Sequence, residues 1–297
     1  MSRTRELADA SPGALDEQRA LLWRLAYRML GSASDADDVL QEVALRWLAA
    51  DRGAIHQPRA WLISVCSRLC ISQIRRTKRA REAYVGPWLP EPVASERADG
   101  LTLGALLRLQ RLKPAERIAL VLHEALGMSH GEIAAMLGRT PVACRQALSR
   151  ARRKLHESSA GRAEAAPASA ERVDALREAL AAGEPRALIA LLADDAVLIS
   201  DGGGRVLSAL RPIAGASRVA RLLAGVMRKA RGALRVESVL VNGARGLALR
   251  SAPSSPFAVI ALETAADGAI GQLLLVRNPD KLRGFTREAA TGSDPSR

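Results

Sequence analysis

The chain has 297 residues, a length typical of two or three domains. Its net charge of +13, with 39 Arg and only 5 Lys, favours an anionic partner, either nucleic acid or an acidic membrane surface. No apolar run is long enough for a membrane span, and the N-terminus lacks the apolar stretch of a signal peptide. Three cysteines do not fit a disulfide framework, so we expect a cytoplasmic protein.

Residues 15–85 are predicted to be helical throughout. Apolar residues across 22–30 recur at the spacing of an amphipathic helix, and Gly31 interrupts that pattern. Ser34 is the expected N-cap of a second helix. A third helix is predicted at 59–81, just after a proline that a helix start tolerates.

The second predicted helix has an acidic face. Asp35, Asp38 and Glu42 lie at i, i+3 and i+7, so their carboxylates share one side of the helix. Such a face repels DNA and fits a basic protein partner. A merely solvated face is the alternative, because carboxylates near a helix N-terminus are stabilised by the helix dipole alone.

The third predicted helix is basic instead. Residues 66–81 contain six Lys or Arg and no acidic residue, and Arg68, Ser72 and Arg75 share one face. Trp61 lies on a neighbouring stripe. A basic face beside an aromatic side chain is typical of contact with a DNA backbone and of stacking on an exposed base. The alternative is a surface stripe with Trp61 buried in the core.

A helix-turn-helix is predicted at 129–155. Ser129 and Glu132 have the spacing of a capping box, Gly138 can end the first short helix, and Thr140-Pro141 can start the second. Two short helices joined by a turn that contains glycine define this motif.

The second helix of the motif carries the positive charge. Residues 139–156 include six Lys or Arg and no acidic residue. Arg145 and Gln146 lie near the helix N-terminus, the part that reaches base edges when such a helix enters a major groove. A solvated basic helix in an unrelated bundle is the alternative.

The rest of the chain has a different pattern. Residues 86–100 hold three prolines and no helical period, and 157–170 are rich in Ala, Ser and Gly, so both are predicted linkers. Helices are expected at 172–192 and 217–229, and hairpin turns at Asn242-Gly243 and Asp267-Gly268. Strands are expected at 196–200, 234–241, 246–250, 257–263 and 270–277.

These elements, in this order, resemble the sigma factors of the extracytoplasmic-function group. The resemblance covers 15–156 and rests on Asp35-Ala-Asp-Asp-Val-Leu-Gln41-Glu42, on Arg59-Ala-Trp61-Leu62, on the basic run and on the helix-turn-helix. The remainder is similar to the subgroup with a fused SnoaL-like domain of the nuclear-transport-factor-2-like fold. Its marks are Gly86-Pro-Trp88-Leu89-Pro90-Glu-Pro92, Asp201-Gly-Gly-Gly204 and Asn278-Pro279-Asp280-Lys281-Leu282.

The resemblance implies a multidomain fold, with two all-α sigma domains, the second a helix-turn-helix, followed by an α+β SnoaL-like cone. The implied parts are sigma domain 2 (15–85), a linker with the Trp-Leu-Pro-Glu-Pro motif (86–100), sigma domain 4 (101–156), a second linker (157–170), the SnoaL-like regulatory domain (171–286) and a flexible tail (287–297).

The resemblance also implies a role for individual residues. Core RNA polymerase would be bound by Asp35, Asp38, Gln41 and Glu42. The −10 promoter element would be bound by Trp61, Arg68, Arg75, Arg76 and Arg79, although Ser72 stands where the family usually has Asp. The −35 element would be bound by Arg145, Gln146, Ser149, Arg150 and Arg153. Regulatory contacts between linker and C-terminal domain are expected at Trp88, Leu89, Pro90, Asp201, Asn278, Pro279, Asp280 and Lys281.

Three classes of function are compatible with parts of the sequence. A helix-turn-helix regulator with a ligand-binding C-terminal domain needs only one DNA reader, so the second basic helix and the acidic helix favour a sigma factor. An enzyme is disfavoured because 157–297 contain no His, Cys, Tyr or Trp for proton transfer. Cys66 and Cys70 are interpreted as buried thiols, and neither a metal nor a cofactor is expected. The expected protein is a monomer that binds core polymerase and promoter DNA; a small ligand of the SnoaL-like domain, and the direction of regulation, stay open.

Overall fold

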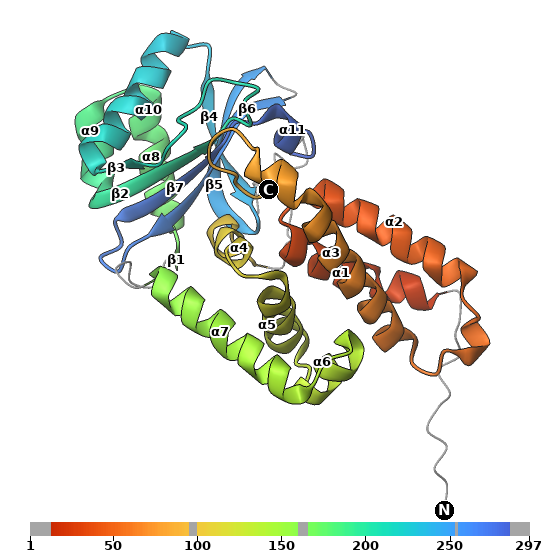
Figure 1. Cartoon of the computed structure of the whole chain (residues 1–297). Coiled ribbons are helices and arrows are strands. Elements are labelled where there is room, and N and C mark those ends of the chain that lie inside the picture. Colours follow the sequence, from red (N-terminus) through yellow and green to blue (C-terminus); the bar gives the residue numbers. More distant parts are fainter. Residues whose placement is uncertain (1–12, 95–99, 160–165, 253–254, 286–297) are drawn as a thin grey trace, which may run out of the picture. The chain divides into compact units, whose positions relative to one another are not determined.

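The computed structural model describes residues 13–94, 100–159, 166–252 and 255–285 (Figure 1). By their contacts the residues cluster into two compact units. Unit 1 comprises Met1–Lys78 and Leu109–Leu155, and unit 2 comprises Arg79–Arg108 and His156–Arg297. No helix among the described residues combines the length and the apolar character needed to cross a membrane.

Unit 1 is helical, as predicted. Its elements, some of which continue into unit 2, are α1 (Ala14–Leu30), α2 (Ala33–Ala49), the 3-10 turn η1 (Arg52–Ala54), α3 (Pro58–Glu82), α4 (Leu103–Gln110), α5 (Pro114–Leu126), α6 (His130–Leu137) and α7 (Pro141–Ser159). Gly31 ends α1 in the left-handed conformation, with φ 69°. The prediction of Ser34 as the next N-cap is wrong. Ser32 has the extended backbone of a cap and its side chain accepts the N–H of Asp35, so α2 begins at Ala33.

The helix-turn-helix of unit 1 is confirmed, together with its caps. Ser129 Oγ accepts the N–H of Glu132, and the Glu132 carboxylate accepts the N–H of Ser129 in return. Gly138 ends α6 with φ 63°, and Thr140 Oγ1 accepts the N–H of Ala143 at the start of α7. Local side chains therefore fix both helix starts.

Within unit 1, α5 packs against α1 through a buried arginine. Arg117 donates to the main-chain oxygen of Met29, which is one of the last carbonyls of α1 without a partner in its own helix. The same guanidinium donates to Gln110 Oε1 at 2.8 Å and to the carbonyl oxygens of Gln110 at 2.8 Å and Leu112 at 3.2 Å. Arg117 thus joins α1 to the segment that carries the helix-turn-helix.

Unit 2 is built on a mixed sheet with strand order β3-β2-β7-β6-β5-β4, and β1 pairs with β6 outside this path. β2 and β7 are parallel, while the other pairs are antiparallel. The strands are β1 (Ala166–Pro167), β2 (Leu192–Asp201), β3 (Ile213–Ala214), β4 (Arg235–Val241), β5 (Ala244–Ala252), β6 (Ser255–Thr264) and β7 (Ile270–Val276). The predicted Asn242-Gly243 hairpin joins β4 to β5, with φ 56° and 76°.

Helices α8 (Ala170–Ala182), α9 (Pro185–Leu191) and α10 (Ala216–Ala230) lie on one side of this sheet (Figure 1). They bury one apolar cluster with the sheet, which includes Val173, Leu223 and Ile260. The segment 172–192, where one or two helices were expected, holds two, and its last residue already belongs to β2. The short strands β1 and β3 were not predicted, because a strand of two residues is too short to show an alternation of apolar and polar side chains.

A second apolar cluster of unit 2 includes residues from well before the sheet. Leu89 and Leu103 are fully buried against strand residues such as Val259 and against Phe285, which follows α11 (Pro279–Leu282). The predicted linker indeed has neither helix nor strand at 86–94, but it packs as part of the C-terminal fold. The expected tail at 287–297 lies outside the described residues.

Candidate functional site

The exposed face of α2 combines acid with apolar surface. Asp38 and Gln41 are exposed, and Glu42 is partly exposed and forms an ion pair with Arg46 at 2.8 Å. Leu45 and Leu48 continue this face at helical spacing, and their exposed fractions are 62% and 65%. Sequence reasoning did not single out Leu45, and it assigned Leu48 to the apolar stripe of this helix, although the two leucines lie seven residues after Asp38 and Gln41. Exposed apolar residues next to carboxylates are typical of a protein-binding surface.

Asp35 differs from the other residues predicted on this face. Its side chain accepts a hydrogen bond from Gln73 Nε2 of α3 at 3.2 Å, and it is partly buried. Asp35 therefore takes part in the packing of α2 against α3, which leaves Asp38, Gln41 and Glu42 as the accessible polar residues.

The basic face of α3 has the predicted composition. Its exposed residues are Arg68, Ser72, Arg75, Arg76 and Arg79. Trp61 is half-buried, and its ring centroid lies 5.5 Å from that of the buried Trp47, with the rings tilted by 56°. One part of the indole thus packs in the core while the other stays accessible.

The α7 face leaves its predicted DNA-reading residues accessible. Arg145, Gln146, Ser149 and Arg153 are all exposed. Arg150 lies 3.6 Å from the buried carboxylate of Glu116, to which Lys154 also donates at 2.8 Å. Burial raises the pKa of the Glu116 carboxyl, but the hydrogen bonds from Lys154 and the Lys113 main chain outweigh this effect, and the pKa is lowered overall. Glu116, which the sequence did not single out, holds α7 on α5.

The predicted linker residues meet the C-terminal domain around one buried carboxylate. Asp201, at the end of β2, is fully buried; its Oδ1 accepts the hydroxyl of Tyr84 at 2.6 Å. Its Oδ2 accepts the main-chain N–H of Leu89 at 2.8 Å and the ammonium of Lys281 at 2.7 Å. Asn278 Nδ2 donates to the Tyr84 hydroxyl at 2.8 Å. We call Tyr84, Asp201, Asn278, Lys281 and the Leu89 main chain the linker clamp.

Burial shifts the proton affinities of the linker clamp. It lowers the pKa of Lys281 to about 8, although the Asp201 carboxylate acts in the opposite direction. Burial and the hydrogen bond to Asp201 raise the pKa of the Tyr84 hydroxyl. Near neutral pH the clamp therefore holds a charged Lys281 and a neutral Tyr84.

Three further residues of the predicted regulatory set lie outside the linker clamp and have secondary roles. Trp88 lies under two cations, with Arg81 and Lys281 both 4.1 Å from its ring centroid. Pro90 is buried beside Leu89. Pro279 is the first residue of α11, where it costs no hydrogen bond.

Asn278 and Asp280, the last two residues of the predicted regulatory set to be described, have different surroundings. Asn278 Oδ1 accepts the N–H of Asp280, which makes Asn278 the N-cap. Asp280 itself is exposed and pairs with Arg283 of the same segment. Asp280 is thus an exposed carboxylate of this motif, and its ion pair with Arg283 lies outside the linker clamp.

Two more contacts, neither of which the sequence indicated, hold the predicted linker and the helix α4 that follows it. Asn242 exchanges hydrogen bonds with Val93, accepting its N–H at 3.0 Å through Oδ1 and donating its own main-chain N–H at 2.8 Å. The buried Glu263 of β6 accepts from Arg108 of α4 at 2.9 Å. A Cβ on Gly104 would lie 2.0 Å from Glu263 Oε1, so only glycine permits this close approach. We call Arg108, Glu263 and Gly104 the α4 clamp.

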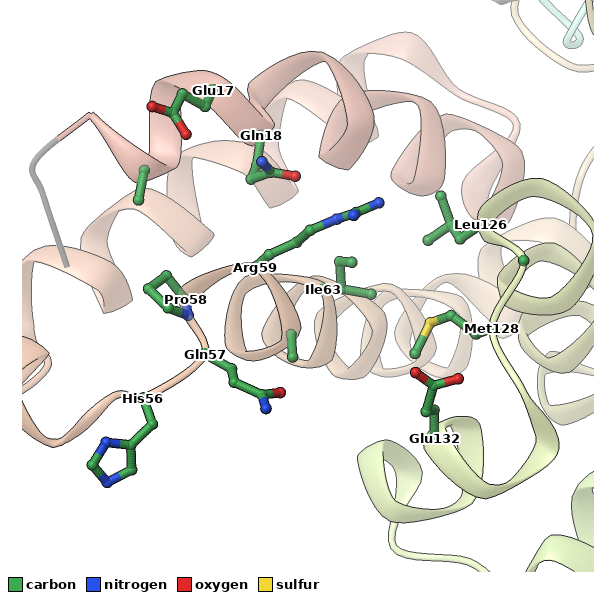
Figure 2. Close-up of a pocket in the computed structure, with 13 residues that line it drawn as sticks. Glu17, Gln18, His56, Gln57, Pro58, Arg59, Ile63, Leu126, Met128 and Glu132 are labelled. Carbon is green, nitrogen blue, oxygen red and sulfur yellow. The ribbon is translucent and has the colours of Figure 1, made fainter. Parts of the chain in front are cut away.

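A pocket of about 490 Å³ lies between α1, the start of α3 and the α5–α6 turn, all within unit 1 (Figure 2). Figure 2 shows Arg59 extending into it, with Glu17 and Glu132 at its edges. The Glu132 carboxylate is already used in the capping box. The mixed charges of the pocket do not indicate a particular ligand.

The three cysteines of the chain are buried. Cys66, Cys70 and Cys144 are all free thiols with buried side chains, as expected. Within the described part of the chain, no group of three or more His, Cys, Asp or Glu side chains could hold a metal ion.

Comparison with known proteins identifies the family. Residues 15–80 match the model of Sigma-70 region 2, and residues 105–155 match that of Sigma-70, region 4. The chain is 34% identical to the ECF RNA polymerase sigma factor SigJ of Mycobacterium tuberculosis over 285 residues, which cover 90% of this chain and 91% of SigJ. It is 40% identical to the probable ECF sigma factor SigI of that species over 161 residues, covering 50% of this chain and 56% of SigI.

The crystal structure of M. tuberculosis SigJ superposes with a TM-score of 0.73 at 30% identity, covering 92% of this chain and 99% of SigJ. The chain therefore belongs to the extracytoplasmic-function (ECF) family of RNA polymerase sigma factors. The predicted family, the predicted sigma-factor function and the fold class of helical sigma domains followed by a sheet-containing domain are confirmed. The alternative of a helix-turn-helix regulator is not favoured.

Proposed function

We propose that this sigma factor binds core RNA polymerase through the exposed face of α2 and reads promoter DNA with α3 and α7. Asp38, Gln41 and Glu42, flanked by Leu45 and Leu48, offer acid and apolar surface to a basic protein partner. The arginines of α3 and α7 offer positive charge to the −10 and −35 elements respectively. The proposal includes that the protein is monomeric and cytoplasmic and that its domains have the boundaries predicted above.

The polymerase contact is tested by reversing the acidic charge. Asp38→Arg with Glu42→Arg places two cations against a basic partner and is expected to weaken core binding by about a hundredfold or more. The matched control is Asp194→Arg with Asp195→Arg, which makes the same charge change on exposed residues of β2. Core binding is measured by co-purification and by titration with labelled core enzyme. Equal retention of both variants by core enzyme, with unchanged circular dichroism, contradicts the assignment.

We further propose that the C-terminal domain modulates transcription by holding the linker between the two sigma domains. The observation that carries this proposal is the buried Asp201 carboxylate, which accepts one hydrogen bond from the Tyr84 side chain and one from the Leu89 main chain. A linker held at these points cannot move freely as the sigma domains take up their places on a promoter. Because the C-terminal domain is tethered to the linker, even a weak contact is populated at the high effective concentration that a short tether gives.

Transcription by reconstituted holoenzyme from a cognate promoter tests the regulatory proposal. Four proteins are compared with the full chain at equal folded concentration: a truncation before Arg172, a deletion from Asn278 onward, Asp201→Asn and Asp280→Asn. The first three remove or weaken the linker clamp and are expected to change transcription while core binding stays intact. Asp280→Asn alters an exposed carboxylate of the same motif and is expected to leave it unchanged. Identical transcription for all five proteins shows that the C-terminal domain does not modulate transcription.

A further inference from the structure

A cationic cleft lies within unit 1, away from the linker clamp. Its volume is about 580 Å³, and it separates the basic face of α3 from the start of α5 and the turn of the helix-turn-helix. Arg68, Ser72 and Arg75 line the α3 side, and Lys113 and Arg139 line the other. Two contacts hold the sides together, because Ser64 and Arg68 both donate to the main-chain oxygen of Met136 at the end of α6.

The charges in this cleft are all of one sign. Arg68, Arg75, Lys113 and Arg139 line it, and none of its lining residues is acidic. Arg75, Lys113 and Arg139 make no ion pair with any residue in the described part of the chain. Cations that line the same cleft repel each other, and an anion between them relieves that repulsion. The pocket of about 490 Å³ described above balances Arg59 with Glu17 and Glu132 and has no such field (Figure 2).

The size of the cleft selects among anions. Its volume falls in the range of small-molecule sites and is far too small for a DNA duplex. The α5 N-terminus beside Lys113 adds a partial positive charge from the helix dipole. Four cations on two walls match a ligand whose charges are spread over several groups, rather than a single carboxylate.

We propose that this cleft binds a small anion with several phosphate groups, of the class of nucleoside polyphosphates, between α3 and the helix-turn-helix segment. Phosphate oxygens accept from Arg68 and Arg75 on one wall and from Lys113 and Arg139 on the other. The bound anion ties the two walls together and covers Arg68 and Arg75. Competition with promoter DNA follows only if α3 reads the −10 element, as proposed above; anion binding itself does not depend on that role.

Calorimetric titration of the full chain with inorganic tripolyphosphate at low salt tests the site. Saturable binding is expected, and Lys113→Gln with Arg139→Gln should weaken it by about tenfold or more, because two of four cations are lost. The control is Arg186→Gln with Arg218→Gln, which lowers the net charge equally on exposed residues of unit 2 and should leave the affinity unchanged. A parallel titration with a nucleoside triphosphate decides whether the base and sugar add affinity to the phosphates.

Three outcomes overturn the proposal. The first is the absence of saturable binding below millimolar tripolyphosphate. The second is equal weakening by both double variants, which assigns binding to net charge. The third is tripolyphosphate binding that ignores Lys113 and Arg139 while binding of single-stranded DNA depends on them, which makes the cleft a nucleic-acid groove. Core-polymerase binding of the same variants is expected to be unchanged, because neither residue lies on α2. Failure of the cleft proposal is therefore distinguishable from failure of the proposed polymerase contact.

Discussion

The linker clamp and the α3 and α7 faces use charge in opposite ways. In the clamp, Asp201 is fully buried and each of its oxygens has a partner, including the nearly buried Lys281. On the α3 and α7 faces, cations such as Arg75 and Arg145 are exposed. A buried charge must keep its partner, because losing it leaves an unpaired charge in the interior. An exposed charge contributes little to folding and remains available to another molecule. We therefore expect substitutions in the clamp to change stability, and substitutions on the faces to change binding.

The largest expected effect is at the centre of the clamp. Asp201→Asn removes the anion that partners Lys281 and should destabilise unit 2 by ~3–5 kcal/mol, since a buried cation loses its partner. Asp280→Asn, at an exposed ion pair of the same motif, should cost ~1 kcal/mol or less. Urea unfolding of the full chain measures both values. Equal values for the two variants contradict the contrast between buried and exposed charge.

The α4 clamp should respond to added volume. Gly104→Ala places a methyl group where Glu263 Oε1 now lies, so the carboxylate must leave Arg108 or α4 must shift, at a cost of ~1–3 kcal/mol. Gly225→Ala in the middle of α10 meets no atom within 4 Å and should stabilise by up to ~1 kcal/mol through helix propensity. Opposite signs in urea unfolding are the expected result. A stabilising Gly104→Ala shows that Glu263 does not hold α4.

The exposed faces should behave differently. Arg145→Ala should leave unfolding unchanged but weaken promoter binding by ~1–3 kcal/mol, with relaxed preference at one base pair of the −35 element if it contacts guanine through two hydrogen bonds. Fluorescence anisotropy with a set of −35 variants measures this. Uniform weakening across the set makes Arg145 a phosphate contact instead.

The smallest expected effect is a pH dependence of the clamp. Lys281 has a pKa of about 8 in the fold against an ordinary value of 10.5, so the unfolded chain binds this proton more tightly. Stability from this group is therefore lowest below pH 8 and rises as the pH increases toward 10.5, by ~1 kcal/mol between pH 7.5 and 9. The raised pKa of Tyr84 opposes the trend above pH 10, where the unfolded tyrosine ionises first.

Nuclear magnetic resonance titration of Lys281 checks the pH dependence directly. In Asp201→Asn the pKa of Lys281 should fall further, because the anion that raises it is gone. A Lys281 pKa near 10.5 in the full chain contradicts burial of the ammonium.

Local chemistry explains what could be predicted from the sequence. Helix caps such as Ser129–Glu132 act over three residues, and the helix-turn-helix follows from them. The choice between Ser32 and Ser34 could not be made, since both residues can cap a helix and only the backbone conformation decides. Asp35 seemed part of the acidic face because helical spacing does not reveal that Gln73 lies opposite it.

Contacts over long sequence separation could not be predicted. Asp201 and Lys281 were found through family resemblance, but their partner Tyr84 was not, since 117 residues separate it from Asp201. Asn242 was expected only to turn a hairpin, and that role is confirmed; its second role, holding Val93, depends on the tertiary fold. The sequence thus predicted the elements well, and their mutual contacts only where a family motif marked them.

Hydrogen exchange of the linker amides tests the central claim that Asp201 holds the linker on the C-terminal domain. The Leu89 N–H donates to Asp201, so it should exchange about a hundredfold more slowly than an unstructured amide in the full chain. In Asp201→Asn that protection should fall, while the amides of α7 keep theirs. Unprotected exchange at Leu89 in the unmodified chain, or equal protection in both proteins, contradicts the account.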